Sequence, residues 1–292
     1  MQILRHRGTE VTEISLIDTR RTRCPRCLCG FVIAILFAVP VSAQWANVPA
    51  TGAPKNADGS PNLNAPAPRA ADGKPDLSGV WRPDRNQKCP PDGCPDNQMS
   101  EQFLDLGWGL KDGLPYQPWA ADLVKARAEQ MGKDDPTLNC FPGGIVRLHT
   151  YPAYNKIVQT PRLIIILSER ELTYRQIFLD GRVLPKDPLP TWKGYSVGRW
   201  EGDTLVVESS GFRNEDIWLD RKGSPLTDAA TITERIRRVN FGRLETQLTI
   251  NDPKAYTRPF TVALNEYLEP AGELMDFVCL ENNTDAQHVI GK

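Results

Sequence analysis

The chain has 292 residues, of which 40% are hydrophobic and 24% are charged, and its formal net charge at pH 7 is −1. These proportions are ordinary for a soluble globular protein, and the length suits one large domain or two modest domains. Because no cluster of Lys and Arg is interleaved with aromatic residues, the sequence argues against nucleic acid as a partner.

The chain begins with a predicted secretory signal peptide, residues 1–43. Its apolar core, Phe31 to Val41, is about half as long as a membrane-spanning helix and follows several arginines. The core ends in Val41-Ser42-Ala43, a small-x-small exit that predicts cleavage after Ala43. We therefore expect a periplasmic or extracellular protein without a membrane span after cleavage; an uncleaved anchor is the alternative.

Four cysteines remain in the mature chain: Cys89, Cys94, Cys140 and Cys279. An even number in an exported chain predicts two disulfides, with three possible pairings. Cys89 and Cys94 bracket a short turn-rich segment, so we expect them to pair, which leaves Cys140 for Cys279. The second bridge closes a loop of roughly 140 residues, enough to stabilise the fold by about 4 to 5 kcal/mol.

A metal site is the alternative use of these cysteines. The mature chain contains two histidines, His149 and His288, and neither lies at ligand spacing from a cysteine. We therefore expect no metal, and the sequence indicates no cofactor.

Residues 44–76 are rich in Pro, Ala, Asn and Gly and contain a short imperfect repeat, ADGSPNL at 57–63 and ADGKPDL at 71–77. Such a segment buries too little apolar surface to offset its ordering entropy, so we expect a flexible tether or a wrap over the domain surface. Two copies are too few for a solenoid. Residues 77–292 are expected to form a single β-rich domain.

Within this domain, one helix and a series of strands are predicted. The helix is expected over 119–131, because Pro118 suits the first helical position and Gly132 ends the pattern. Strands are expected at 157–159, 163–167, 174–179, 195–200, 204–208, 231–239, 243–250, 260–268 and 274–280.

Three pairs of these strands are predicted hairpins, with glycine-containing turns at 201–203, 240–242 and 270–272. Eight or more short strands in hairpin order are typical of an antiparallel barrel or sandwich. We expect a mainly β, lipocalin-like fold of this kind, with one short helix before it and a disordered N-terminal segment.

The chain also resembles known sequences. Gly79-Val80-Trp81 is similar to the Gly-x-Trp opening near the first strand of lipocalin-like barrels. A family of secreted bacterial β-rich proteins shares the motifs DLSGVW at 76–81, QIFLDGR at 176–182, GYSVGRWEGDTLVV at 194–207 and TER at 233–235. The resemblance covers roughly residues 72–292. It implies export and a β-rich fold, and it supplies no activity and no catalytic residues.

Signatures of several enzyme classes are absent from the sequence. It has no Gly-x-x-x-x-Gly-Lys phosphate loop, no Gly-x-Gly-x-x-Gly segment and no His-Glu-x-x-His motif. We therefore do not expect a nucleotide-dependent enzyme or a zinc peptidase of the standard types.

Two carboxylates in apolar rows of predicted strands are the first catalytic candidates. Side chains alternate along a strand, so Glu234 shares a face with Ile232 and Ile236, and Glu266 lies in a similar apolar row. A carboxylate removed from water has a raised pKa unless a cation pairs with it. The two can therefore act as general acid and base in one cavity. Alternatively, each Glu is salt-bridged to an Arg or lies at a barrel mouth.

His149 and Asp180 form the second catalytic hypothesis. His149 is the default proton-transfer residue near neutral pH, and a hydrogen-bonded structural role is its alternative. Asp180 precedes Gly181 at the end of a predicted strand, so turn formation is its alternative role.

Candidate binding residues bring charge and aromatic surface together. A long polar loop on a β scaffold often holds binding groups, although turn formation and packing at a barrel end are the alternatives. The candidates are Arg147, Arg182, Trp192, Tyr195, Trp218 and Asp220.

These features support three hypotheses about function. The first is an exported binding protein that holds a small, partly apolar molecule in the β scaffold. The alternative is an enzyme that performs acid–base chemistry on a small molecule in the same cavity. The third is an envelope interaction module with residues 44–76 as its tether.

Overall fold

The computed structural model describes residues 52–85, 99–170, 173–279 and 281, all within the unit that spans Ala43–Lys292. The predicted signal peptide, the predicted pair Cys89 and Cys94, and His288 lie outside these residues. Among the residues described, no helix combines the length and the apolar character that crossing a membrane requires.

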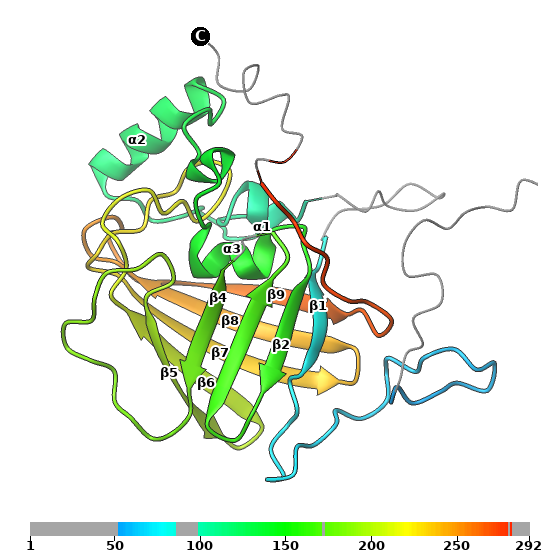
Figure 1. The fold of residues 1–292 in the computed structure, drawn as a ribbon. Helices are drawn as coiled ribbons and strands as arrows, with labels where there is room; N and C mark the ends of the chain where they lie inside the picture. Colours follow the sequence, from blue (N-terminus) through cyan, green and yellow to red (C-terminus); the bar gives the residue numbers. More distant parts are fainter. Residues whose placement is uncertain (1–51, 86–98, 171–172, 280, 282–292) are drawn as a thin grey trace, which may run out of the picture. The chain divides into compact units, whose positions relative to one another are not determined.

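In the described part of the chain, nine strands close into one barrel, and neighbours in the barrel follow the order of the chain (Figure 1). This confirms the mainly β fold and shows a barrel rather than a sandwich. The strands are β1 (Gly79–Pro83), β2 (Asn155–Gln159), β3 (Leu163–Ser168), β4 (Tyr174–Phe178), β5 (Tyr195–Glu201), β6 (Thr204–Ser210), β7 (Thr231–Asn240), β8 (Arg243–Asn251) and β9 (Phe260–Leu268).

The alternating sequence explains the barrel wall. In β7, Ile232, Glu234 and Ile236 are buried on one face, as their spacing predicts. The predicted hairpins around 201–203 and 240–242 are confirmed, because β5 pairs antiparallel with β6 and β7 pairs antiparallel with β8. Gly202 in the first turn has a φ of +61°, which favours glycine because it has no Cβ.

The predicted third hairpin is wrong. Residues 274–279 form no strand in the part of the chain that the structure describes. The second edge of β9 pairs with β1 instead, from Trp81 opposite Leu268 to Pro83 opposite Glu266. The segment after β9 is held by Cys279, whose disulfide to Cys140 confirms the predicted long-range bridge.

The pairing of β4 with β5 also differs from the antiparallel prediction. These two strands run parallel, and only Ile177 with Ser196 and Phe178 with Val197 are in register. A parallel pair needs a long crossover between its strands, and residues 179–194 provide it. We call this short parallel junction the seam of the barrel.

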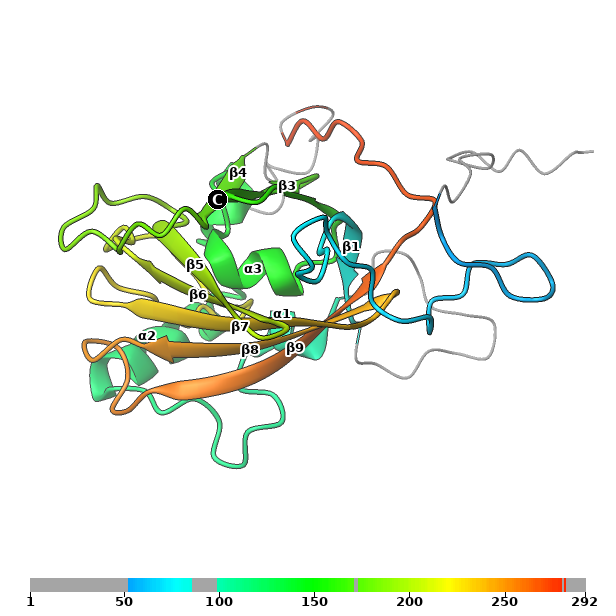
Figure 2. The same ribbon diagram turned by 90° about the horizontal axis from the view of Figure 1, so that it is seen from below.

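The described residues contain more helix than the single one expected. The predicted helix is α2 (Pro118–Glu129), with Pro118 in its first turn. The additional segments are α1 (Glu101–Leu104), a 3₁₀ helix η1 (Pro136–Asn139) and α3 (Gly144–Thr150). All seven residues of α3 are buried, and the helix packs against β1 and β9 at one end of the barrel (Figures 1 and 2).

The imperfect repeat before the barrel forms the same turn twice. In the first copy Asn56 N–H donates to Ser60 and Asp58 accepts from the Ser60 amide. The equivalent bonds in the second copy run from Ala70 to Lys74 and from the Lys74 amide to Asp72.

The described part of the 44–76 segment lies on the barrel, which agrees with a wrap rather than a tether. Phe241 and Gly242, in the β7–β8 turn, donate their amides to the carbonyls of Ala65 and Leu63. Arg69 forms an ion pair with Asp203 in the β5–β6 turn at 2.6 Å.

Candidate functional site

A chain of buried charges crosses the barrel interior with His149 at its centre. The His149 ring, carried by α3, lies between Glu234 of β7 at 2.8 Å from Nε2 and Glu266 of β9 at 2.6 Å from Nδ1. Arg175 of β4 binds both oxygens of Glu234, with Nη1 at 2.9 Å from Oε1. None of these four residues is more than 5% exposed.

Glu234 and His149 are each held in the ionised form by their neighbours. Burial alone would raise the pKa of Glu234, but the Arg175 charge and the bonds from His149 and Arg175 lower it to about 2. Burial would lower the pKa of His149, but the Glu266 charge and the bonds to both glutamates raise it to about 9. His149 is therefore an imidazolium at neutral pH and donates from both ring nitrogens.

This arrangement decides between the two interpretations of the buried carboxylates. Glu234 has its cation, and its pKa lies below the ordinary value rather than above it. Glu266 pairs with the imidazolium. The structure therefore shows the paired alternative, and a carboxylate with so low a pKa is a weak general base at neutral pH.

Ser196 extends the charge chain toward the seam, and it lies in the sequence Gly194-Tyr195-Ser196-Val197-Gly198. That Gly-x-Ser-x-Gly spacing is typical of the nucleophile of α/β-hydrolases, where the serine sits on a turn between a strand and a helix. Here Ser196 lies within β5 and is 1% exposed. Its hydroxyl contacts Arg175 at 3.2 Å and Ser209 at 2.8 Å, neither of which is a base. The Gly-x-Ser-x-Gly motif therefore lies within a strand here, and it lacks the turn that exposes the nucleophile in α/β-hydrolases.

A second polar cluster, around Asp135, positions α3 from outside the barrel. Arg147 of α3 binds Asp135 at 2.9 Å and the Asp220 carbonyl at 2.7 Å. Arg221 shares Asp135 at 3.1 Å. Burial raises the pKa of the Asp220 carboxyl, although that group accepts bonds from Leu106 and Ser224.

Two predicted binding residues, Trp218 and Asp220, are buried in this region and pack within the fold. Trp218 is 3% exposed and lies beneath the Arg127 guanidinium at 4.3 Å from its ring centre. Asp220 is fully buried. The groove and the cavity described next are lined by neither residue.

A groove of about 470 Å³ opens along the seam. It lies where β5 pairs with β4 only from Ile177 onward, so the earlier residues of β4 have no paired strand on that side. Tyr174, Gln176 and Phe178 line it from the outer face of β4, and Trp192 lines it from the crossover. The buried Arg175 and Ser196 also line the groove, so the interior charge chain reaches its wall.

Aromatic pairs with an arginine over one ring flank the groove on both sides. Phe178 stacks on Tyr195 with ring centres 5.2 Å apart, and Arg182 lies over Phe178 and donates to the Tyr195 hydroxyl at 2.8 Å. Asp180 holds Arg182 at 2.5 Å, and these bonds lower the pKa of Asp180 to about 2. Asp180 therefore orients an arginine and does not contact His149.

On the opposite side, Trp192 stacks on Phe141 with ring centres 5.4 Å apart, beneath the guanidinium of Arg213. Tyr174 remains 62% exposed at the rim. An exposed aromatic surface of this kind suits the planar or apolar part of a small molecule.

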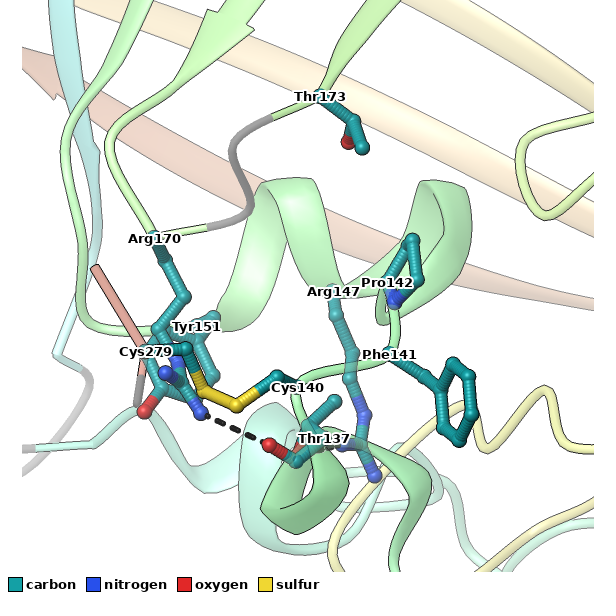
Figure 3. A pocket seen from close by; sticks show the side chains of 9 residues that line it. All are labelled: Thr137, Cys140, Phe141, Pro142, Arg147, Tyr151, Arg170, Thr173 and Cys279. Atoms are coloured by element: carbon teal, nitrogen blue, oxygen red, sulfur yellow. Dashed lines mark hydrogen bonds between the residues drawn. A yellow bond between two sulfur atoms is a disulfide. The ribbon is translucent and has the colours of Figure 1, made fainter. Parts of the chain in front are cut away.

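The molecule also has a smaller cavity of about 90 Å³, and Figure 3 shows the residues that line it. The Cys140–Cys279 disulfide, Arg147 and Arg170 are among its walls. Pro142 and Thr173 line both spaces, so the cavity and the groove share a wall.

The sequence candidates fall into separate places. Glu234, Glu266 and His149 meet inside the barrel, Trp192 and Tyr195 line the groove with Arg182 beside them, and Arg147 lines the small cavity. The sequence analysis missed Arg175, Arg170, Phe141 and Phe178. The alternation of side chains along a strand could have identified Arg175, because it shares the inner face of β4 with Ile177.

Among the described residues, no group of three or more His, Cys, Asp and Glu side chains is arranged to hold a metal ion. The chain matches no family model, no curated protein and no solved structure.

Proposed function

We propose that the protein is an exported binding protein that holds a small, partly apolar molecule in the groove at the β4–β5 seam. One observation carries the proposal: the barrel wall is incomplete there, and the opening is lined by partly exposed aromatic side chains. The Cys140–Cys279 disulfide supports an oxidising compartment outside the cytoplasm.

The proposed site is on the outer side of the barrel wall and not in its interior. Tyr174 and Gln176 alternate with the inward Arg175, so the groove follows the outer face of β4 and meets the interior charge chain at Arg175 and Ser196. The barrel interior is filled by apolar residues and by the paired charges around His149. The acid–base alternative has less support, because Glu234 and Glu266 both have cationic partners.

Binding of N-phenyl-1-naphthylamine, a neutral fluorescent aromatic probe, tests this function. We expect saturable binding to the wild-type protein. Tyr174→Ala and Trp192→Ala should each weaken binding about 2- to 10-fold, as expected for loss of one aromatic contact. Trp119→Ala is the matched control, because Trp119 is an exposed aromatic residue on α2 outside the groove. Absent binding, or equal affinity in all variants, would contradict the proposal.

A further inference from the structure

We propose that the small cavity beside the disulfide receives the anionic end of the groove ligand, a carboxylate or a similar oxyanion. This inference rests on the proposed binding function and adds the chemical class of the ligand: an apolar body that carries one anionic group. The cavity, the donors that line it and its connection to the groove each support the assignment.

The cavity has room for a small polar group such as a carboxylate. Its volume of about 90 Å³ corresponds to about three water molecules at their liquid volume. Phe141, Tyr151 and the disulfide supply apolar walls, which exclude bulk water and strengthen electrostatic interactions within.

Two buried N–H donors in the cavity walls have no partner among the described residues. They are Nε of Arg147 and Nε of Arg170 (Figure 3). The other nitrogens of Arg147 are occupied by Asp135, Thr137 and the Asp220 carbonyl, and the side chain is 1% exposed. A buried charged group without a full set of acceptors is unfavourable, so an anion in the cavity would stabilise both guanidinium charges.

The charges around the cavity favour an anion as that acceptor. The described lining residues include two arginines and no carboxylate. Asp135 neutralises Arg147 but is shared with Arg221, so two cations meet one carboxylate. In the described part of the chain, Arg170 makes no ion pair and lies over the rings of Tyr151 and Phe277.

The shared wall allows one molecule to occupy both spaces. Pro142 and Thr173 line the cavity and the groove, and Phe141, a cavity residue, stacks on Trp192, a groove residue. A ligand whose apolar part lies on the aromatic side chains of the groove can therefore extend a short tethered anion into the cavity, toward the guanidinium charges of Arg147 and Arg170.

Competition against bound N-phenyl-1-naphthylamine tests the inference with a matched pair of ligands, 4-phenylbutyrate and its neutral amide, 4-phenylbutyramide. A charge-assisted bond is expected to give the carboxylate an advantage of about tenfold in the wild-type protein. Arg170→Gln should remove that advantage and leave competition by the amide unchanged. Arg258→Gln is the charge control, because Arg258 is exposed between β8 and β9 and lines neither space, and it should retain the advantage.

The outcomes separate this inference from the proposed function. If the probe does not bind, the groove function fails. If the probe binds but the wild-type protein gives the carboxylate and the amide equal potency, the anion site is wrong while the groove function stands. This wild-type comparison does not depend on the folding of any variant. Equal loss of the advantage in Arg258→Gln and Arg170→Gln would also overturn the site, because it would indicate general electrostatic attraction.

Discussion

The barrel interior and the β4–β5 seam both contain cations and polar groups, but they differ in how these groups are satisfied. In the interior, Arg175, Glu234, His149 and Glu266 alternate in charge and bind one another. At the seam, strand pairing covers two residue pairs, and aromatic rings stay partly exposed beside it. The comparison teaches that the buried, mutually paired charges of this protein hold the fold together, whereas its open surface at the seam presents partly exposed aromatic side chains.

The largest expected effect comes from breaking the interior chain. Glu234→Gln removes the carboxylate that Arg175 and His149 share, and leaves two buried cations against Glu266 alone. We expect a loss of about 3–5 kcal/mol in the free energy of unfolding, measured by urea denaturation near pH 7. Glu208→Gln on β6 is the control, because that carboxylate is exposed and pairs with an exposed Arg199. Similar losses in both variants would show that the interior chain does not stabilise the barrel.

Loss of the long disulfide should come next. Cys140→Ser together with Cys279→Ser opens a loop with a sequence separation of 139 residues. We expect a loss of about 2–5 kcal/mol, read from the urea midpoint without a reducing agent. An unchanged midpoint would mean that the segment after β9 is held without the bridge.

The interior chain also predicts a pH dependence of stability. The pKa of His149 is raised to about 9 in the folded protein, so its contribution is complete below the ordinary value of 6.5 and is lost as the pH rises toward 9. The pKa of Glu234 is lowered to about 2, so its contribution is complete above the ordinary value of 4.5 and is lost as the pH falls toward 2. The network therefore stabilises the fold most between these two ordinary values.

The variant Glu266→Gln checks the alkaline side of this profile. Without the Glu266 charge, the pKa of His149 should lie closer to its ordinary value. The urea midpoint should then fall less between pH 6.5 and pH 9 than it does in the wild-type protein. NMR titration of the His149 ring gives the same comparison directly, and equal ring pKa values in the two proteins would refute it.

The smallest expected effect concerns the wrap formed by residues 52–76. Asp203→Asn removes the exposed ion pair with Arg69, and exposed pairs contribute little to global stability. We expect an unchanged urea midpoint but faster hydrogen exchange at the amides of Phe241 and Gly242, which donate to this segment. A clear shift of the midpoint would show that the wrap is part of the cooperative fold.

Strand alternation was sufficient to predict a mainly β barrel or sandwich and the inward positions of Glu234 and Glu266, but it did not decide between the two architectures. The same rule mispredicted a strand at 274–280, of which the described residues 274–279 form none, because alternation does not say which edge of the sheet is already occupied. β1 occupies that edge of β9, and the chain instead continues to Cys279.

Two parts of the candidate site depend on tertiary structure and were beyond sequence patterns. A helix as short as α3 is marginal in isolation and owes its stability to burial, so no local signal predicted the helix that carries Arg147 and His149. The groove depends on where a parallel pairing begins, at Ile177 and Ser196, and no turn motif encodes that register.

The central claim, that the ligand lies at the seam and not in the barrel interior, can be tested by NMR on the isotope-labelled protein. On titration with N-phenyl-1-naphthylamine, the indole N–H of Trp192 and the amides of Tyr174 and Gln176 should shift in a saturable manner. The chemical shifts of the His149 ring and of the β7 amides around Glu234 should not change. Shifts concentrated at His149 and along β7, with Trp192 unchanged, would place the ligand inside the barrel and contradict the account.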